Sequence, residues 1–178
     1  MSQKGEQCVT DIVFTATARG KFSGNGITCQ CAIGRGGMIA AAQKREGDGT
    51  TPLGKWRMKR VFYRPDRLDR PETALPVIPL AEHDGWCDAP DHPMYNRPVR
   101  LPFSASHERL WRDDHVYDLI VELTHNDDPI VAGLGSAVFF HLSRDDFRPT
   151  EGCVAIPQDY MLAVLNHATT ESYLEMQY

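Results

Sequence analysis

A histidine and a cysteine stand close together in the C-terminal third of this 178-residue chain. His141 ends the apolar run Phe139-Phe140-His141, and Cys153 follows after eleven intervening residues, directly behind Gly152. A thiol attacks a carbonyl carbon efficiently only as the thiolate, and a neighbouring imidazole is a common base for producing it. Glycine lets the backbone approach a reacting group closely, so we expect the N–H groups of Gly152 and Cys153 to stabilise an oxyanion. The pair predicts nucleophilic catalysis by cysteine, and a buried structural cysteine beside a core histidine is the alternative.

The residues around the cysteine, and a second motif upstream, make the first interpretation the stronger one. Residues 150–155 read TEGCVA, and residues 47–54 read GDGTTPLG. With His141 they resemble the L,D-transpeptidase catalytic domain, the YkuD-type family of bacterial cell-wall enzymes. That family combines a His, then Ser/Thr-His-Gly-Cys, with an upstream Thr-Pro-x-Gly turn before a strand. The resemblance extends from about Ile12 to Leu165.

The resemblance implies a role for each matched residue. Cys153 would be the nucleophile and His141 the general base and acid, Gly152 would supply a backbone N–H to the oxyanion, and Thr150 matches the Ser/Thr of the signature. It also implies a mostly β fold (β-rich α+β), a mixed β-sandwich with a C-terminal helix packed on the sheet. It implies neither a cofactor nor a metal.

The activity that the resemblance implies is peptidoglycan L,D-transpeptidation through a thioester on Cys153. Such a transferase (an acyltransferase) joins peptidoglycan stem peptides during cell-wall biosynthesis and contributes to cell shape. Two alternatives remain: an L,D-carboxypeptidase or endopeptidase that uses the same nucleophile, and a non-catalytic cell-wall-binding module. The family acts in the periplasm or facing the cell wall, whereas the polar residues 1–7 carry no visible export signal.

Two positions depart from the signature. Glu151 stands where most of the family has His, and Ala155 stands where Arg or Asn is common. We therefore expect Glu151 to contact substrate and to alter its recognition. The stem residue that donates the acyl group stays open.

Composition limits the class of protein. The chain is 42% hydrophobic and 24% charged, with a net charge of −5, which is typical of a globular protein and argues against a nucleic-acid partner. Its length predicts one domain, residues 1–178, with a core at about 9–170. No segment has the roughly 18 consecutive apolar residues of a membrane span. Five cysteines leave at least one thiol unpaired, and we expect no disulfide between Cys29 and Cys31 on one strand.

Hydrophobic periodicity predicts the elements that position the motifs. We expect a helix that begins at Pro157, with Asp159 in its first turn, and that packs Tyr160, Met161, Val164, Leu165 and Ala168 on the sheet. A break in the apolar phase near Lys59–Arg60 predicts a bulge, and the basic residues there are expected to face solvent or, as the alternative, substrate carboxylates. Strands are expected at 9–16, 27–33, 38–42, 54–64, 117–124 and 137–142.

Residues 65–115 are rich in Pro, Asp and Arg, and a segment this long usually carries function. We expect it to form one wall of the substrate cleft. Its acidic, His and Cys residues match no compact zinc motif, so we expect no metal. Candidate substrate-binding residues are Trp86, Tyr95, Asn96 and Arg97 from this segment and Asn126 from the next turn.

His141 needs a partner that fixes its tautomer. The family resemblance points to a backbone carbonyl for this partner. Asn126 and Asp127 are the alternatives.

Overall fold

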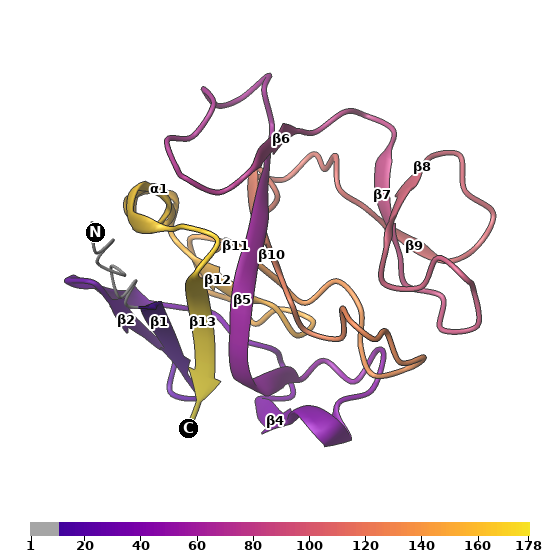
Figure 1. The fold of residues 1–178 in the computed structure, drawn as a ribbon, viewed down its shortest axis with the longest axis horizontal. Coiled ribbons are helices and arrows are strands. Elements are labelled where there is room, and N and C mark those ends of the chain that lie inside the picture. Colours follow the sequence, from indigo (N-terminus) through magenta and orange to yellow (C-terminus); the bar gives the residue numbers. More distant parts are fainter. Residues whose placement is uncertain (1–10) are drawn as a thin grey trace, which may run out of the picture.

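The computed structural model describes residues 11–178, and β-strands are its main elements (Figure 1). The predicted mostly β fold with a helix near the C-terminus is confirmed. The strands are β1 (Ile12–Thr17), β2 (Lys21–Gly24), β3 (Ile27–Gln30), β4 (Met38–Ala40), β5 (Thr51–Tyr63), β6 (Val77–Pro79), β7 (Asp84–Cys87), β8 (Pro98–Arg100), β9 (His107–Arg109), β10 (Leu119–Leu123), β11 (Phe139–Leu142), β12 (Val154–Ile156) and β13 (Ser172–Gln177). The helices are the short 3₁₀ turn η1 (Ala41–Gln43) and α1 (Gln158–His167).

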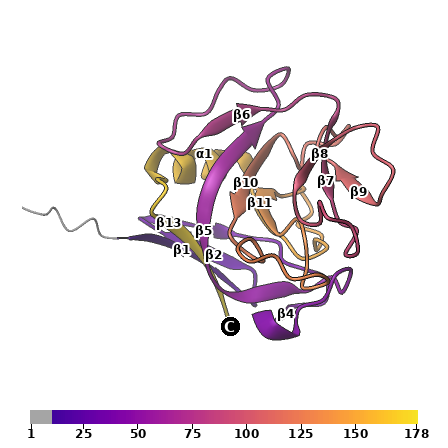
Figure 2. The same cartoon turned by 45° about the vertical axis from the view of Figure 1, so that its right-hand side comes forward.

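One mixed sheet runs through the molecule in the order β12-β11-β10-β5-β13-β1-β2-β3. The long strand β5 curves through its middle, as Figure 2 shows, and carries one half of the sheet on each side. The two outer ends meet, because Ala32 and Ala155 exchange backbone hydrogen bonds of 2.8 and 2.9 Å. The halves therefore face each other as the predicted sandwich, and β12 is fixed on both sides.

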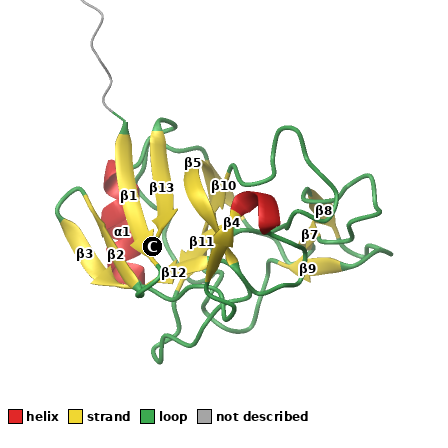
Figure 3. Ribbon diagram, turned by 90° about the horizontal axis from the view of Figure 1, so that it is seen from below, coloured by secondary structure: helices red, strands yellow, loops and turns green. Residues whose placement is uncertain are grey.

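The larger hydrophobic core lies between these halves. Phe22 of β2 stacks on Phe140 of β11 with ring centroids 5.4 Å apart, so the two halves meet across the core. Helix α1, which Figure 3 shows behind β1 and β2, closes one side and buries Met161, Val164 and Leu165. The prediction for Tyr160 was wrong: its side chain lies on the outer face of α1 and is 41% exposed.

Residues 82–115 form a lobe at the end of the molecule away from β1–β3 (Figure 3). The earlier part of the segment, residues 65–79, lies against the main core, where Leu75 is buried and β6 pairs with β5. A three-stranded sheet, in the order β8-β7-β9, is the centre of this lobe. Its Trp86 packs edge-on against Phe139 at 5.0 Å, in a second hydrophobic cluster that also contains Cys153. The lobe is therefore packed against the face of β11 and β12 opposite to the main core.

The sequence analysis did not predict seven of the strands: β2, β6, β7, β8, β9, β12 and β13. β13 lies in the centre of the sheet, parallel to β1 and antiparallel to β5. It buries Ser172, Leu174 and Met176 and turns Tyr173 and Glu175 outward. Only two of its inward residues are apolar, so the alternation is weak in the sequence.

The predicted irregularity near Lys59 is confirmed, because the register of β5 against β10 shifts between Arg60 and Met58. Arg57 is exposed to solvent as expected, whereas Lys59 and Arg60 are half-buried. Lys59 and Arg60 both pair with Glu122, which is buried on β10. A buried carboxylate needs such partners. The burial of Glu122 could not be predicted from the sequence alone.

Candidate active site

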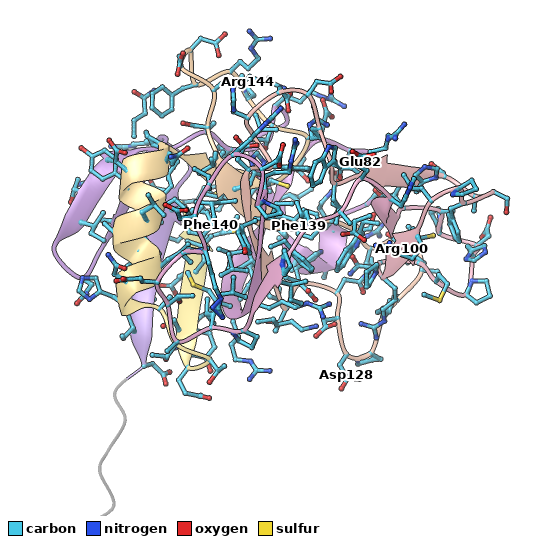
Figure 4. The ribbon with its side chains drawn as sticks, turned by 90° about the horizontal axis from the view of Figure 1, so that it is seen from above. Glu82, Arg100, Asp128, Phe139, Phe140 and Arg144 are labelled. Carbon is cyan, nitrogen blue, oxygen red and sulfur yellow. The ribbon has the colours of Figure 1, made fainter. Side chains whose placement is uncertain are left out.

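The pairing of β11 with β12 brings the predicted catalytic residues to one face of the sheet. The strands are parallel, with Phe140 opposite Val154 and His141 opposite Ala155. Alternate residues of a strand point to opposite faces. Phe140 and Val154 enter the main core, so His141 and Cys153 emerge on the other face. Figure 4 shows this division, with Phe140 toward α1 and Phe139 toward the lobe.

A cavity of about 1360 Å³ opens over this face, and both His141 and Cys153 line it. Residues of the lobe, from Glu82 on, form one side of this cavity, whereas residues 65–81 do not line it. That this side is a wall of the substrate cleft stays a prediction. The side chains around it include both acids and bases. The acids are Glu46, Glu82, Asp88, Glu108, Asp113, Asp114 and Glu151, and the bases are Lys44, Arg109, Arg112, Arg144 and Arg148.

A backbone carbonyl fixes the tautomer of His141, as the family resemblance suggested. His141 Nδ1 lies 2.9 Å from the carbonyl oxygen of Leu142, and a carbonyl can only accept, so Nδ1 carries the proton. Nε2 is then the basic nitrogen. Burial lowers the pKa of His141 to about 4, so the ring is neutral at neutral pH. The ring of Tyr117 packs edge-on against it at 5.1 Å.

The thiol of Cys153 is held by two backbone groups. Sγ donates to the carbonyl of Ala137 at 3.1 Å and accepts the N–H of Phe139 at 3.3 Å. Burial, and then the negative charge of Glu108, raise the pKa of Cys153 to about 12. The cysteine and histidine are therefore a neutral thiol and a neutral imidazole, rather than a thiolate–imidazolium pair.

The turn before Cys153 is held by contacts with a distant loop. Thr150 exchanges backbone hydrogen bonds with Ile33 and Arg35, of 2.9 and 2.8 Å. Its side-chain hydroxyl donates to the carbonyl of Cys153 at 2.7 Å and accepts the N–H of Gly152 at 3.2 Å. The side chain of Thr150 thus stabilises the turn by bonding to both Gly152 and Cys153.

The two sequence motifs meet at Gly152. A Cβ atom placed on this residue would lie 2.7 Å from the carbonyl oxygen of Thr50, a backbone atom of the upstream motif. Gly152 also has φ +137°, where side chains are strained. Glycine is therefore required at this point both by conformation and by contact.

We expect Gly152→Ala to lower the free energy of unfolding by about 1–3 kcal/mol through backbone strain, and further through the contact with Thr50. Gly133→Ala is a matched control, because Gly133 has φ +79° but open space where its Cβ would stand. Urea denaturation gives the free energy of unfolding of both variants, and the difference between their losses is the cost of the contact with Thr50. Equal losses would mean that the turn moves away from Thr50 without cost.

Lys44 is a buried part of the site that the sequence analysis missed. Its side chain is 4% exposed, and Nζ binds Asp48 at 2.5 Å and the carbonyl of Arg45 at 2.8 Å. Asp48 also accepts the N–H groups of Arg45 and Thr50, so it organises the loop that touches Gly152. The only signal in the sequence is the run KREGD at 44–48, which resembles an ordinary solvated loop.

The residues predicted to bind substrate make their contacts within the protein. Asn96, which is buried with φ +53°, accepts the indole N–H of Trp86 at 2.9 Å and the backbone N–H of Ala137 at 3.0 Å. Ala137 is the residue whose carbonyl accepts the thiol of Cys153. Asn96 thus supports the backbone that holds the candidate nucleophile.

Tyr95, Arg97 and Asn126 extend the same network. The hydroxyl of Tyr95 contacts Glu46 and the N–H of Gly135, Arg97 pairs with Asp127 at 2.9 Å, and Asn126 donates to two carbonyls of its own loop. Direct contact of these residues with substrate stays a prediction. Their described contacts tie the lobe to residues 125–137.

The two departures from the family signature have different surroundings. Glu151 lines the cavity rim with its side chain 78% exposed, and it pairs with Arg35 at 2.8 Å. Such an exposed pair contributes little to stability, so Glu151 is available to a ligand. Ala155 is buried in the cavity floor.

Glu108 and Tyr117 also line the cavity, and the sequence analysis missed both. The hydroxyl of Tyr117 donates to Glu108 at 2.7 Å. Their contact joins the lobe strand β9 to the residue two before β10, and no spacing rule predicts such a tertiary pair.

Cys29, Cys31, Cys87 and Cys153 are free thiols, which confirms the prediction for the first two, and Cys8 lies outside the described residues. Within residues 11–178 no three His, Cys, Asp or Glu side chains are placed to hold a metal ion. No helix in that range is long and apolar enough to cross a bilayer.

Comparison with known proteins agrees with the motifs. The family model described as YkuD, L,D-transpeptidase catalytic domain, matches residues 15–172. Among curated proteins none matches the chain. The crystal structure of Mycobacterium tuberculosis L,D-transpeptidase 1 is similar at 11% sequence identity and a TM-score of 0.45. The similarity covers 94% of this chain and 60% of that one, so this chain spans less than two thirds of it.

Proposed function

Because this chain belongs to the YkuD family of L,D-transpeptidase catalytic domains, we propose that it is a cysteine-dependent peptidoglycan L,D-transpeptidase that cross-links stem peptides. The observation that carries the proposal is the position of His141 and Cys153 on one face of adjacent strands, in one cavity. The acids and bases around that cavity suit stem peptides, which bear both carboxylates and amines. The proposed place of action is the cell wall or periplasm.

In the first step Cys153 attacks the carbonyl carbon of an L,D-peptide bond in the donor stem. Because the thiol and the imidazole both start neutral, the thiol proton passes to Nε2 of His141 as the carbon–sulfur bond forms. The thiol first turns its proton away from the carbonyl of Ala137. The N–H of Phe139, which already donates to Sγ at 3.3 Å, steadies the developing thiolate.

The oxyanion of the tetrahedral intermediate is proposed to bind the N–H groups of Cys153 and Gly152. The N–H of Gly152 now donates to Thr150 over a long 3.2 Å, so exchanging this bond for one to an oxyanion costs little. Each such donor contributes about 3 kcal/mol in other acyl-transfer enzymes. The D-residue then leaves with the proton from His141, and a thioester remains.

An amine of a second stem attacks the thioester and completes the cross-link. Water in its place would make the protein an L,D-carboxypeptidase or endopeptidase. The choice depends on which nucleophile reaches the thioester, and the cavity is large enough to admit a second peptide.

Mass spectrometry of disaccharide tetrapeptides and pentapeptides, incubated with the wild type and with Cys153→Ala, tests the proposal. We expect cross-linked dimers with the wild type alone, because the variant lacks the sulfur atom that forms the thioester. Shortened monomers alone would identify a hydrolase. No Cys153-dependent product would contradict both activities, provided that the variant keeps the circular dichroism spectrum of the wild type.

A further inference from the structure

Glu108 is held beside the candidate catalytic pair. It lies on β9, in the lobe wall of the cavity, and its Oε1 accepts the hydroxyl of Tyr117 at 2.7 Å. The ring of Tyr117 in turn contacts the ring of His141 at 5.1 Å. Tyr117 and Cys153 share one buried cluster. The carboxylate is thus positioned by a rigid aromatic side chain at the reacting centre.

The carboxylate of Glu108 makes no salt bridge within the described residues. Among residues 11–178 no Lys, Arg or His nitrogen lies within 4.0 Å of its carboxylate. Arg112, a basic side chain of the same cavity, is engaged with Asp114 at 2.8 Å. Burial raises the pKa of Glu108, against the effects of the bond from Tyr117 and of the more distant charge of Arg112. An unneutralised carboxylate in a partly closed cavity is costly, and a bound cation would remove that cost.

Asp88 is a second acid of the cavity that makes no salt bridge within the described residues. Asp88 lines the same wall, and its buried Oδ1 has no hydrogen-bond partner among the described residues. Arg109 and Arg112 stand in the same wall, but the acids Glu82, Asp88, Glu108, Asp113 and Asp114 outnumber them. The other bases of the cavity are Lys44, Arg144 and Arg148. The lobe wall therefore presents negative charge close to the thiol of Cys153.

We propose that Glu108, oriented by Tyr117, binds the ammonium group of the acceptor and brings it to the thioester on Cys153. This inference rests on the proposed transpeptidase function and assigns its acceptor subsite. The ligand is a primary alkyl ammonium, the form in which an aliphatic amine side chain exists at neutral pH. The donor stem, whose charged groups near the scissile bond are carboxylates, is better matched to the arginines.

The acyl group passes from Cys153 to the amine in one exchange of bonds. The ammonium releases one proton to solvent, and the nitrogen lone pair forms a bond with the thioester carbonyl carbon. The carbon–sulfur bond breaks, and a second proton of the nitrogen passes through His141 to the sulfur. Cys153 returns as a thiol. Glu108 contributes by concentrating the amine at this carbon, since an ion pair is stronger in a cavity than in water.

Glu108→Gln tests the inference, because the amide is isosteric and its oxygen still accepts from Tyr117. The thioester is first formed with a donor tetrapeptide and no amine, and its decay is followed by mass spectrometry after an amine is added. The KM for a stem-peptide amine should rise about tenfold or more. Thioester formation should not slow, because removing the charge of Glu108 lowers the pKa of Cys153. Hydroxylamine, a nucleophile that is uncharged at neutral pH, should react equally with both proteins.

Asp91→Asn is the matched control, because Asp91 is an exposed acid of the same lobe that does not line the cavity. It should behave as the wild type. Added salt supplies a second measurement if Glu108→Gln fails to fold: in the wild type it should weaken the reaction with the stem amine but not with hydroxylamine.

The outcomes separate the two proposals. A thioester that reacts equally well with the stem amine in the wild type and in Glu108→Gln would overturn the acceptor subsite alone. Equal losses toward both nucleophiles would do the same, because they would show a general structural role. A wild type that never forms a thioester would refute the transpeptidase function itself.

Discussion

Replacing Asp48 with alanine should lower the free energy of unfolding by about 3–5 kcal/mol, the usual cost of leaving a buried charge without its partner. Lys44, which is 4% exposed, would keep only the carbonyl of Arg45. The N–H groups of Arg45 and Thr50 would also lose their acceptor. Urea denaturation at neutral pH measures this difference.

The effect should depend on pH in a defined direction. Burial acts to raise the pKa of Asp48, but bonds from Lys44, Thr50 and Arg45 outweigh it and lower the pKa to about 2. A lowered pKa means that the stabilisation is complete above the unfolded value of about 3.9 and is lost as pH falls toward 2. The wild type should therefore approach the stability of the variant below about pH 4.

Asp11→Ala provides the control, since it breaks an exposed ion pair with Lys55, at 2.9 Å. Its cost should stay within about 1 kcal/mol. If Asp48→Ala were no more destabilising than Asp11→Ala, Lys44 would be able to reach solvent through the cavity, and the loop beneath Gly152 would not depend on the pair.

Lys44 and Asp48 also show which part of the site could not be predicted from the sequence. The motif at 47–54 could be identified because its residue types are specific, and the structure places Thr50 against Gly152 of the second motif. The neighbouring Lys44 could not, because nothing in a run of charged residues tells a buried lysine from a solvated one. Its burial depends on a tertiary contact that brings a second loop over it.

Strand length explains much of what was missed in the fold. β5 is marked by apolar alternation with one break and β10 by a run of apolar residues, and their predicted positions are confirmed to within a few residues. The lobe strands β7, β8 and β9 have three or four residues each, too few for a period to be visible. Their pairing is instead stabilised by contacts such as Trp86 with Phe139.

In the candidate site, too, some residues were predicted and others were missed. The sequence places His141 and Cys153 near each other, because both belong to motifs that end or precede short strands. It does not place Tyr117 or Glu108, which reach the cavity from other elements. It also left open whether the thiol and imidazole are charged, which burial decides in favour of the neutral pair.

Replacing His141 with glutamine should lower the rate of thioester formation by about 10²–10⁴-fold, the range typical of a lost general base. Because the pKa of Cys153 is raised to about 12 by burial and by Glu108, almost no thiolate exists at neutral pH without a base. Glutamine can accept a hydrogen bond but cannot take the proton. Rapid-quench mass spectrometry of the acyl-enzyme, with a donor tetrapeptide, measures this step.

The pH dependence distinguishes lost proton transfer from a damaged site. The rate of His141→Gln should rise steeply as pH increases, about tenfold per unit while the thiol remains mostly protonated, because hydroxide then replaces the imidazole as base. His125→Gln is the control, since His125 is also buried and bound to a carbonyl, that of Leu134 at 3.0 Å, but does not line the cavity. It should lose stability yet keep thioester formation within about tenfold of the wild type. A His141→Gln variant whose residual rate does not change with pH would contradict the neutral pair, because the thiolate would then form without His141.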